Sequence, residues 1–133
     1  FGVYLPLSIT KVTPPVMGQQ VADPSIVKTV VHMMESDVLP GGSGVRAAVP
    51  GYRLATKTGT AEKLGDSGKY DGGYVNYTAG VAPVSHPEVA LVVVVNNPTA
   101  GTHFGGSVAA PIFGNIMGPV LKNMNIAPDA LIQ

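Results

Sequence analysis

Apolar residues follow two different periods along this chain, and each period predicts a type of secondary structure. Segments 5–12, 53–61, 74–82 and 89–96 alternate with period two or are rich in β-branched residues, which predicts strands. Segments 24–37 and 107–124 have apolar residues at helical spacing, which predicts helices. The chain is therefore expected to combine helices with a sheet.

Local signals refine the two expected helices. Asp23 is a residue type that caps helices, and Pro24 suits the first helical position, so the first helix is expected to begin there. Pro111 fits the first turn of the second helix, whereas Pro119 is expected to bend or shorten it.

The connections between the predicted strands are too short for a parallel crossover. An antiparallel sheet with packed helices, in the α+β class, is the expected fold. Segment 89–95 is apolar throughout, which predicts a strand in the middle of the sheet, covered on both faces.

Composition narrows the functional classes. At 133 residues the chain has the size of about one domain, and its 45% of hydrophobic residues is typical of a globular protein. Eight basic residues balance eight acidic residues, which disfavours nucleic acid or an anionic membrane as a partner. The absence of cysteine excludes disulfides, thiolate catalysis and cysteine-based zinc sites.

The most informative motif is Lys57-Thr58-Gly59-Thr60, which follows an apolar segment. On an extended strand Thr58 and Thr60 project to one face and Lys57 to the other, while Gly59 leaves room for a close approach to the backbone. Hydroxyls, a cation and an open backbone suit the binding of a carboxylate. The alternative is a solvated lysine on an edge strand.

Two other short motifs are interpreted as chance matches. Ser25-Ile26-Val27-Lys28 has the S-x-x-K spacing that pairs a nucleophilic serine with a lysine, but it coincides with an ordinary helix start. Asn76-Tyr77-Thr78 is a glycosylation sequon, but it lies within a predicted strand.

The remaining candidate features are loops and histidines. Loop 40–44 is rich in glycine but lacks the lysine of a phosphate-binding loop. The three histidines are scattered, so no metal site is expected and no cofactor is indicated; His32 is expected on a helix surface. Segment 102–106, with His103 and Phe104, suits either one wall of a ligand groove or a loop anchored by a buried phenylalanine.

Nearly the whole chain resembles the C-terminal part of the transpeptidase domain of class B penicillin-binding proteins, most closely the division-specific type. The resemblance is carried by Gly18-Gln19-Gln20-Val21, Arg46-Ala47-Ala48-Val49-Pro50-Gly51-Tyr52-Arg53, Lys57-Thr58-Gly59-Thr60-Ala61, Thr78-Ala79-Gly80-Val81-Ala82-Pro83, Phe104-Gly105-Gly106 and Ala110-Pro111-Ile112-Phe113. It implies part of the penicillin-binding, serine β-lactamase-like fold, with residues 1–133 forming the C-terminal portion of one transpeptidase domain.

The resemblance also implies an activity, which is D,D-transpeptidation of peptidoglycan stem peptides at the division septum through a serine acyl-enzyme that β-lactams acylate. Lys57 and Thr60 would then be catalytic, with Lys57 in the active-site hydrogen-bond network and the Thr60 N–H in the oxyanion hole. Thr58 and Thr60 would hydrogen-bond the substrate carboxylate, and Gly59 would also belong to the substrate-binding residues. Tyr74, His103 and Phe104 would form an aromatic wall.

Further expectations concern location and partners. The resemblance implies the periplasmic face of the bacterial inner membrane, an anchor outside this chain, and contacts with membrane proteins of the division machinery. Neither S-x-x-K nor S-x-N occurs at a plausible place, so the nucleophile is expected upstream and this chain alone is not expected to be active. Thr56 replaces the usual glycine before the motif lysine, and His103 stands where tyrosine is frequent.

Two alternatives remain within the same superfamily. A serine β-lactamase or β-lactam sensor would need a water-activating base, which would also lie outside this chain. A degenerate, non-catalytic module would serve only protein contacts.

Overall fold

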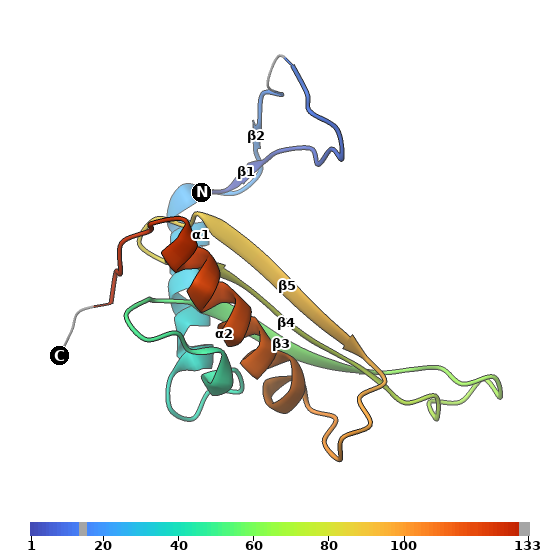
Figure 1. The fold of residues 1–133 in the computed structure, drawn as a ribbon. Coiled ribbons are helices and arrows are strands. Elements are labelled where there is room, and N and C mark those ends of the chain that lie inside the picture. The colour runs from blue at the N-terminus through green and yellow to red at the C-terminus, as the bar shows by residue number, and fades with distance from the viewer. Residues whose placement is uncertain (14–15, 131–133) are drawn as a thin grey trace.

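The structure is a computed structural model that describes residues 1–13 and 16–130. Its centre is an antiparallel sheet with helix α2 packed across one face (Figure 1). The strands and helices, in chain order, are β1 (Val3–Tyr4), β2 (Gln19–Gln20), α1 (Pro24–Met34), the 3-10 helices η1 (Glu35–Val38) and η2 (Val45–Ala47), β3 (Ala55–Glu62), β4 (Tyr74–Ala82), β5 (Val89–Asn96) and α2 (Gly105–Asn123). The expected α+β class is confirmed.

The sheet has the strand order β3-β4-β5, and both pairs are antiparallel. Thr58 lies opposite Thr78, and Thr60 lies opposite Asn76. The loop between β3 and β4 continues the hairpin beyond the sheet, since Lys63 N donates to Gly73 O at 2.8 Å. The predicted strands 74–82 and 89–96 are confirmed to the residue, and the motif strand is confirmed with a shift of one or two residues at its ends.

Helix α1 begins at Pro24, as predicted. Its cap is Asp23, whose carboxylate accepts from the Ser25 backbone N–H. The α-helix ends at Met34, and residues 35–37, the end of the predicted helix, belong to the 3-10 helix η1 (Glu35–Val38).

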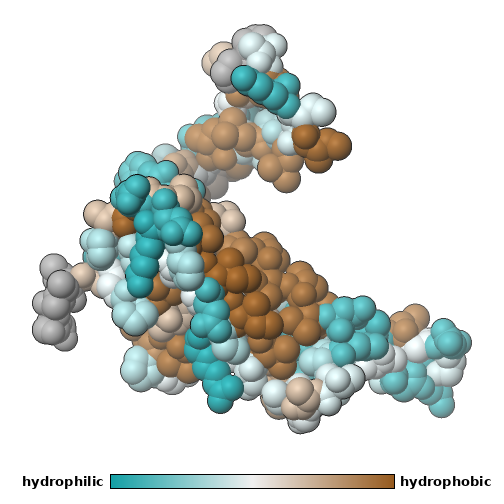
Figure 2. Space-filling view, viewed as in Figure 1, coloured by the Kyte–Doolittle hydropathy of each residue, from teal (hydrophilic) through white to brown (hydrophobic). Residues whose placement is uncertain are grey.

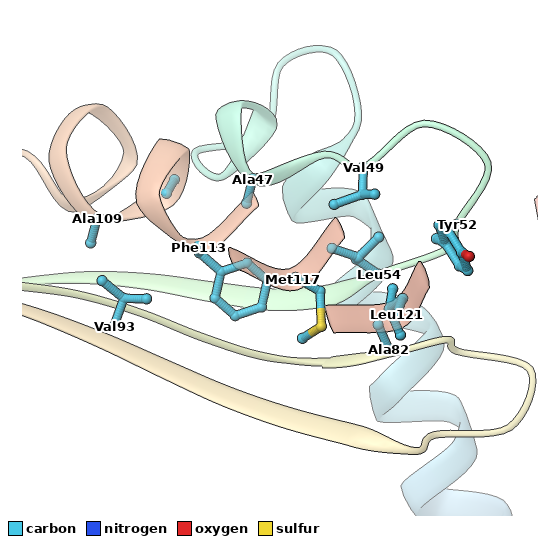
Figure 3. Packing of buried hydrophobic residues seen from close by; sticks show 11 residues of the cluster. Ala47, Val49, Tyr52, Leu54, Ala82, Val93, Ala109, Phe113, Met117 and Leu121 are labelled. Atoms are coloured by element: carbon cyan, nitrogen blue, oxygen red, sulfur yellow. The ribbon is translucent and has the colours of Figure 1, made fainter. Parts of the chain in front are cut away.

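The core lies between α2 and the sheet (Figure 3). Phe113, Met117 and Leu121 point from α2 toward the sheet and are fully buried against Leu54 and Val93. Burial of side chains of this size is the main stabilising contribution to the packing of α2 on the sheet.

The expected effect of the two prolines in α2 was wrong. Pro111 is the seventh residue of the helix rather than part of its first turn, and the helix continues past Pro119 to Asn123. Each proline removes one backbone hydrogen bond. Met117 and Leu121, which flank Pro119, are fully buried, and their packing on the sheet offsets that loss.

The strand predicted over residues 5–12 is also wrong. Among residues 1–13 only Val3–Tyr4 is in a strand, and it pairs with Gln19–Gln20 in a small arm that stands away from the main sheet (Figure 1). Leu7 and Ile9 are 98% and 105% exposed, so no neighbouring element is packed against them. Pro6 lacks an N–H, and a segment without an adjacent strand cannot form a hydrogen-bonded ladder.

The prediction that 89–95 lies in the middle of the sheet is wrong as well. Within the described residues β4 is the central strand and β5 is an edge. Val93 is buried under α2, whereas Val92 and Val94 are 63% and 60% exposed on the opposite face. Figure 2 shows this apolar surface over β5. A continuous apolar run does not distinguish a strand covered on both faces from one covered on a single face.

Candidate functional site

The motif residues lie on β3, and the strand separates them as predicted. Thr56, Thr58 and Thr60 share the face of the sheet that α2 covers, while the exposed Lys57 points to the opposite face. Thr58 and Thr60 line a groove of about 390 Å³ between β3, the segment 43–46 and the N-terminus of α2. The motif therefore contributes two hydroxyls to one groove and a lysine to another.

Lys57 lines a second, larger cavity of about 690 Å³, between β3, the end of α1 and the segment 36–42. Met33 and Leu39 provide apolar parts of its wall, and both side chains are exposed. The Lys57 ammonium donates to the backbone carbonyl of Thr58, which holds the lysine beside its own strand.

The Tyr77 ring packs directly against Gly59 on the motif strand. A Cβ at Gly59 would lie 2.1 Å from Cζ of Tyr77, whose ring lies across the strand on the Lys57 face. Gly105, the first residue of α2, is more strictly constrained, because a Cβ there would lie 2.4 Å from the backbone carbonyl oxygen of Gly59. These two glycines allow the helix and the neighbouring strand to approach the motif.

Thr60 is fixed by the start of α2. The Gly105 N–H donates to Thr60 Oγ1 at 2.9 Å, and the Thr60 hydroxyl donates to Asn76 Oδ1 at 3.3 Å. The first N–H groups of a helix have no partner within the helix, so this bond satisfies one of them. Asn76 is fully buried on β4, which agrees with the interpretation of its sequon as a chance match.

The three predicted wall residues meet although Tyr74 is distant from the others in sequence. The rings of Tyr74 and His103 stack with centroids 4.2 Å apart and an interplanar angle of 15°, and His103 lies 4.5 Å from the Phe104 ring. Phe104 is 61% exposed and lines the same groove as Thr58. Of the two readings of segment 102–106, the groove wall is therefore the one that the structure favours over a buried anchor.

Sequence reasoning missed the residues that support Thr58 from the Gly-rich loop. Ser43 Oγ lies 2.6 Å from Thr58 Oγ1 and donates to Asp37 Oδ1 at 2.6 Å. Thr56 donates to the other carboxylate oxygen of Asp37 at 2.7 Å. Thr56, the departure from the usual glycine, therefore points to Asp37 and is fully buried. No spacing rule relates a loop serine to a strand threonine 15 residues later.

Arg46 was also missed as a site residue. It is exposed at η2 and lines the groove together with Thr58, Thr60 and Phe104. A guanidinium favours a carboxylate ligand through charge and paired hydrogen bonds. Arg46 therefore gives this groove a positive charge, whereas the charge of Lys57 lies on the opposite face of β3.

An ion pair joins Glu35, directly after α1, to Arg53, which lies just before β3. Arg53 Nη2 and Nε donate to the two oxygens of Glu35 at 2.6 and 2.9 Å, and His32 Nδ1 lies 2.8 Å from Glu35 Oε1. Burial raises the pKa of the Glu35 carboxyl, but the hydrogen bonds and charges of Arg53 and His32 outweigh burial and lower its pKa below the ordinary value. His32 itself is exposed on the helix surface, as predicted.

The S-x-x-K match does not belong to the site. Ser25 donates to Asp23 Oδ1 at the helix cap, and Lys28 lies 5.4 Å from the Phe1 ring centroid. Neither lines the groove at Thr58 or the cavity at Lys57. The interpretation of Ser25 as an ordinary helix start is confirmed.

Residues 1–13 and 16–130 contain no group of three histidine or acidic side chains that could hold a metal ion. None of the helices in this part of the chain is both long and apolar enough to span a bilayer.

Comparison with known proteins gives concordant matches. Residues 1–118 match the family described as penicillin binding protein transpeptidase domain. The chain is 64% identical over 131 residues to the peptidoglycan D,D-transpeptidase FtsI of Escherichia coli K12, and 47% identical to FtsI of Buchnera aphidicola from Schizaphis graminum. Each alignment covers 98% of this chain but only 22% and 23% of those relatives.

A solved structure shows the same fold. The transpeptidase domain of penicillin-binding protein 3 from Burkholderia pseudomallei superimposes with a TM-score of 0.85 at 38% identity. It aligns with 98% of this chain and 40% of its own chain. The present chain thus spans about a fifth of the curated relatives and two fifths of the solved domain.

Proposed function

Because this chain belongs to the family of penicillin-binding protein transpeptidase domains, we propose that it is the C-terminal portion of one such domain in a peptidoglycan D,D-transpeptidase. The relatives named as that enzyme are about four to five times longer than the aligned segment. A preceding segment of the protein would supply the nucleophilic serine of S-x-x-K and the S-x-N motif.

The observation that supports this proposal most strongly is the groove at Thr58 and Thr60. It is lined by Thr58, Thr60, Arg46 and the N-terminus of α2, so two hydroxyls, an arginine and a helix N-terminus belong to one groove. Each of these groups favours a carboxylate. The substrate implied by the family ends in D-Ala-D-Ala, whose terminal carboxylate would bind here, and β-lactams carry a carboxylate in the corresponding position.

The catalytic roles follow from the position of the motif strand. Within the described residues β3 is an edge strand, so part of its backbone N–H groups face away from β4. We assign the Thr60 N–H to the oxyanion hole, where it would stabilise charge that develops on the scissile carbonyl oxygen. Lys57 would join the hydrogen-bond network of the missing serines on the other face.

The aromatic wall would select the rest of the ligand. Phe104 lines the groove, and His103, which stacks on Tyr74, lies beside the Phe104 ring. Such surfaces bind apolar or planar groups of a peptide or of a β-lactam side chain. Gly59 would contact the ligand through its backbone, since the Tyr77 ring fills the space beside its Cα.

The cellular setting is part of the same proposal. We place the active site at the periplasmic face of the inner membrane, with the anchor elsewhere in the protein, and expect contacts with membrane proteins of the division machinery. The named relatives support a role in peptidoglycan synthesis.

Gel labelling with a fluorescent penicillin tests the proposal on the longer protein and on the 133-residue chain. A label on the longer protein alone supports a serine acyl-enzyme completed by a preceding segment. Stable labelling of the 133-residue chain would contradict the placement of the nucleophile. Absence of label on both would favour a non-catalytic module, and rapid turnover of a chromogenic β-lactam would favour a β-lactamase.

A further inference from the structure

The Ser43 hydroxyl lies between the Asp37 carboxylate and the Thr58 hydroxyl. Both oxygen-to-oxygen distances are 2.6 Å, which is within the range of short hydroxyl hydrogen bonds. Ser43 is held in this place by the start of α2, where a Cβ at Gly106 would lie 1.9 Å from the Ser43 carbonyl oxygen. Loop 40–44 therefore presents one particular hydroxyl to the motif strand.

The number of protons decides the direction of each hydrogen bond. An ionised carboxylate only accepts, and a hydroxyl has a single proton to donate. Asp37 receives Ser43 Oγ and the Gly44 N–H on one oxygen and Thr56 Oγ1 on the other. Since Ser43 gives its proton to Asp37, the hydrogen bond between Ser43 and Thr58 must be donated by Thr58.

Thr58 therefore presents lone pairs, not its proton, to the groove. A ligand carboxylate needs a donor, so it must compete with Ser43 for the Thr58 proton. When the Thr58 hydroxyl turns toward the ligand, Ser43 Oγ loses the hydrogen bond that Thr58 donated to it.

Thr60 differs in this respect. Its oxygen accepts from the Gly105 N–H at 2.9 Å, and its proton goes to Asn76 Oδ1 over the longer distance of 3.3 Å. Because its hydrogen bond to Asn76 is longer and weaker, turning the Thr60 proton toward a ligand costs less free energy than turning the Thr58 proton. The two hydroxyls of the groove are unequal donors.

We propose that Ser43 is a positioning residue that withholds the Thr58 proton from carboxylate ligands and so lowers the affinity of the groove for them. Asp37 acts through Ser43. Thr60 is the hydroxyl that donates more readily to a ligand carboxylate. This inference rests on the proposed function, because it assumes that a β-lactam carboxylate binds at Thr58 and Thr60.

A double-mutant cycle in the longer protein tests it. Acylation by a fluorescent penicillin is followed at increasing concentration, which separates the dissociation constant of the complex before acylation from the acylation rate constant. Ser43→Ala frees the Thr58 proton and is expected to lower the dissociation constant about five-fold, the equivalent of one neutral hydrogen bond. The melting temperature of each variant reports on folding.

The Thr58 variants distinguish positioning from a structural effect of the loop. In a Thr58→Val background Ser43→Ala should leave the dissociation constant unchanged, because no proton remains to be released. In a Thr58→Ser background, which keeps the hydroxyl, the five-fold gain should persist.

Two results would overturn the inference, namely an unchanged or weaker affinity of Ser43→Ala and a gain that survives Thr58→Val. Failure of the proposed function itself looks different, since the wild-type protein would then not be acylated.

Discussion

The backbone N–H of Gly105 donates to Thr60 Oγ1 at 2.9 Å, which joins the start of α2 directly to the motif strand. A Cβ at Gly105 would lie 2.4 Å from the Gly59 carbonyl oxygen, a backbone atom that cannot move aside. The distance between helix and strand, and with it the width of the groove, therefore depends on a glycine at this position.

Gly105→Ala is expected to push α2 away from β3, to destabilise the domain by about 1–3 kcal/mol through overpacking, and to slow acylation by penicillin. Gly118→Ala is the matched control on the same helix. A Cβ there would meet the Val49 side chain at 3.2 Å, and alanine favours a helix by about 1 kcal/mol over glycine. Urea unfolding and acylation kinetics should place Gly118→Ala near the wild type; equal losses in the two variants would argue against a special role of Gly105.

Lys57→Ala should slow acylation of the longer protein by penicillin about a hundred-fold or more, the typical loss when one electrostatic group of an active site is removed. Lys63→Ala is the control, because Lys63 follows β3 and its side-chain ammonium donates to Asn96 Oδ1 at 3.1 Å. The acylation rates of both variants are measured by stopping the labelling reaction at a series of times and quantifying the label on gels. A normal rate for Lys57→Ala would support the alternative of a solvated lysine.

His103→Ala removes the middle ring of the stack formed with Tyr74 and Phe104. Aromatic pairs contribute about 0.5–1.5 kcal/mol beyond their buried area, so penicillin should bind several-fold more weakly before acylation. His103→Tyr preserves a ring and should bind like the wild type. His86→Ala changes an exposed histidine in the β4–β5 turn and serves as the control; a matching loss in it would contradict a role of the wall.

Glu35→Gln should reduce the free energy of unfolding of the domain by about 1 kcal/mol at pH 7, because it removes the charge from two hydrogen bonds with Arg53. The pKa of Glu35 is lowered in the folded state, so its contribution is complete above the ordinary value of 4.5 and is lost as the pH falls through the lowered pKa. Urea unfolding of both proteins should therefore converge in acid. A difference that stays constant with pH would exclude the ion pair as its source.

Val92→Lys combined with Val94→Lys should reduce self-association of the 133-residue chain, since both side chains form the exposed apolar surface of β5 (Figure 2). Leu64→Lys is the control, because Leu64 is similarly exposed but lies in the β3–β4 loop. Sedimentation velocity measures the distribution of species. A wild-type chain that is already monomeric would contradict the expectation.

Local signals predicted the elements well where each element depends on its own residues. Asp23 and Pro24 mark the start of α1, and the alternation over 74–82 marks β4. Local signals failed where the secondary structure of a segment depends on the elements packed against it. The segment 5–12 has a strand-like pattern but pairs with no strand in the part of the chain that the structure describes, and Pro119 lies within a helix because the residues around it are buried.

The candidate site divides in the same way. The motif of Lys57 to Thr60 and the separation of its side chains onto two faces followed from strand periodicity, and the role of the aromatic residues followed from the resemblance. Ser43, Asp37 and Arg46 were not found, since their relation to Thr58 is created by a loop that folds back on the strand.

The sequence by itself determined the α+β class, the motif strand, and the family through an ordered set of matching segments. Only the tertiary structure decided that β5 is an edge strand within the described residues, that Tyr74 stacks on His103, and that Ser43 bonds Thr58. The physical reason is the range of the forces involved. Backbone periodicity and caps act within a few residues, whereas a face is covered or a hydroxyl is oriented only by groups that chain folding brings from elsewhere.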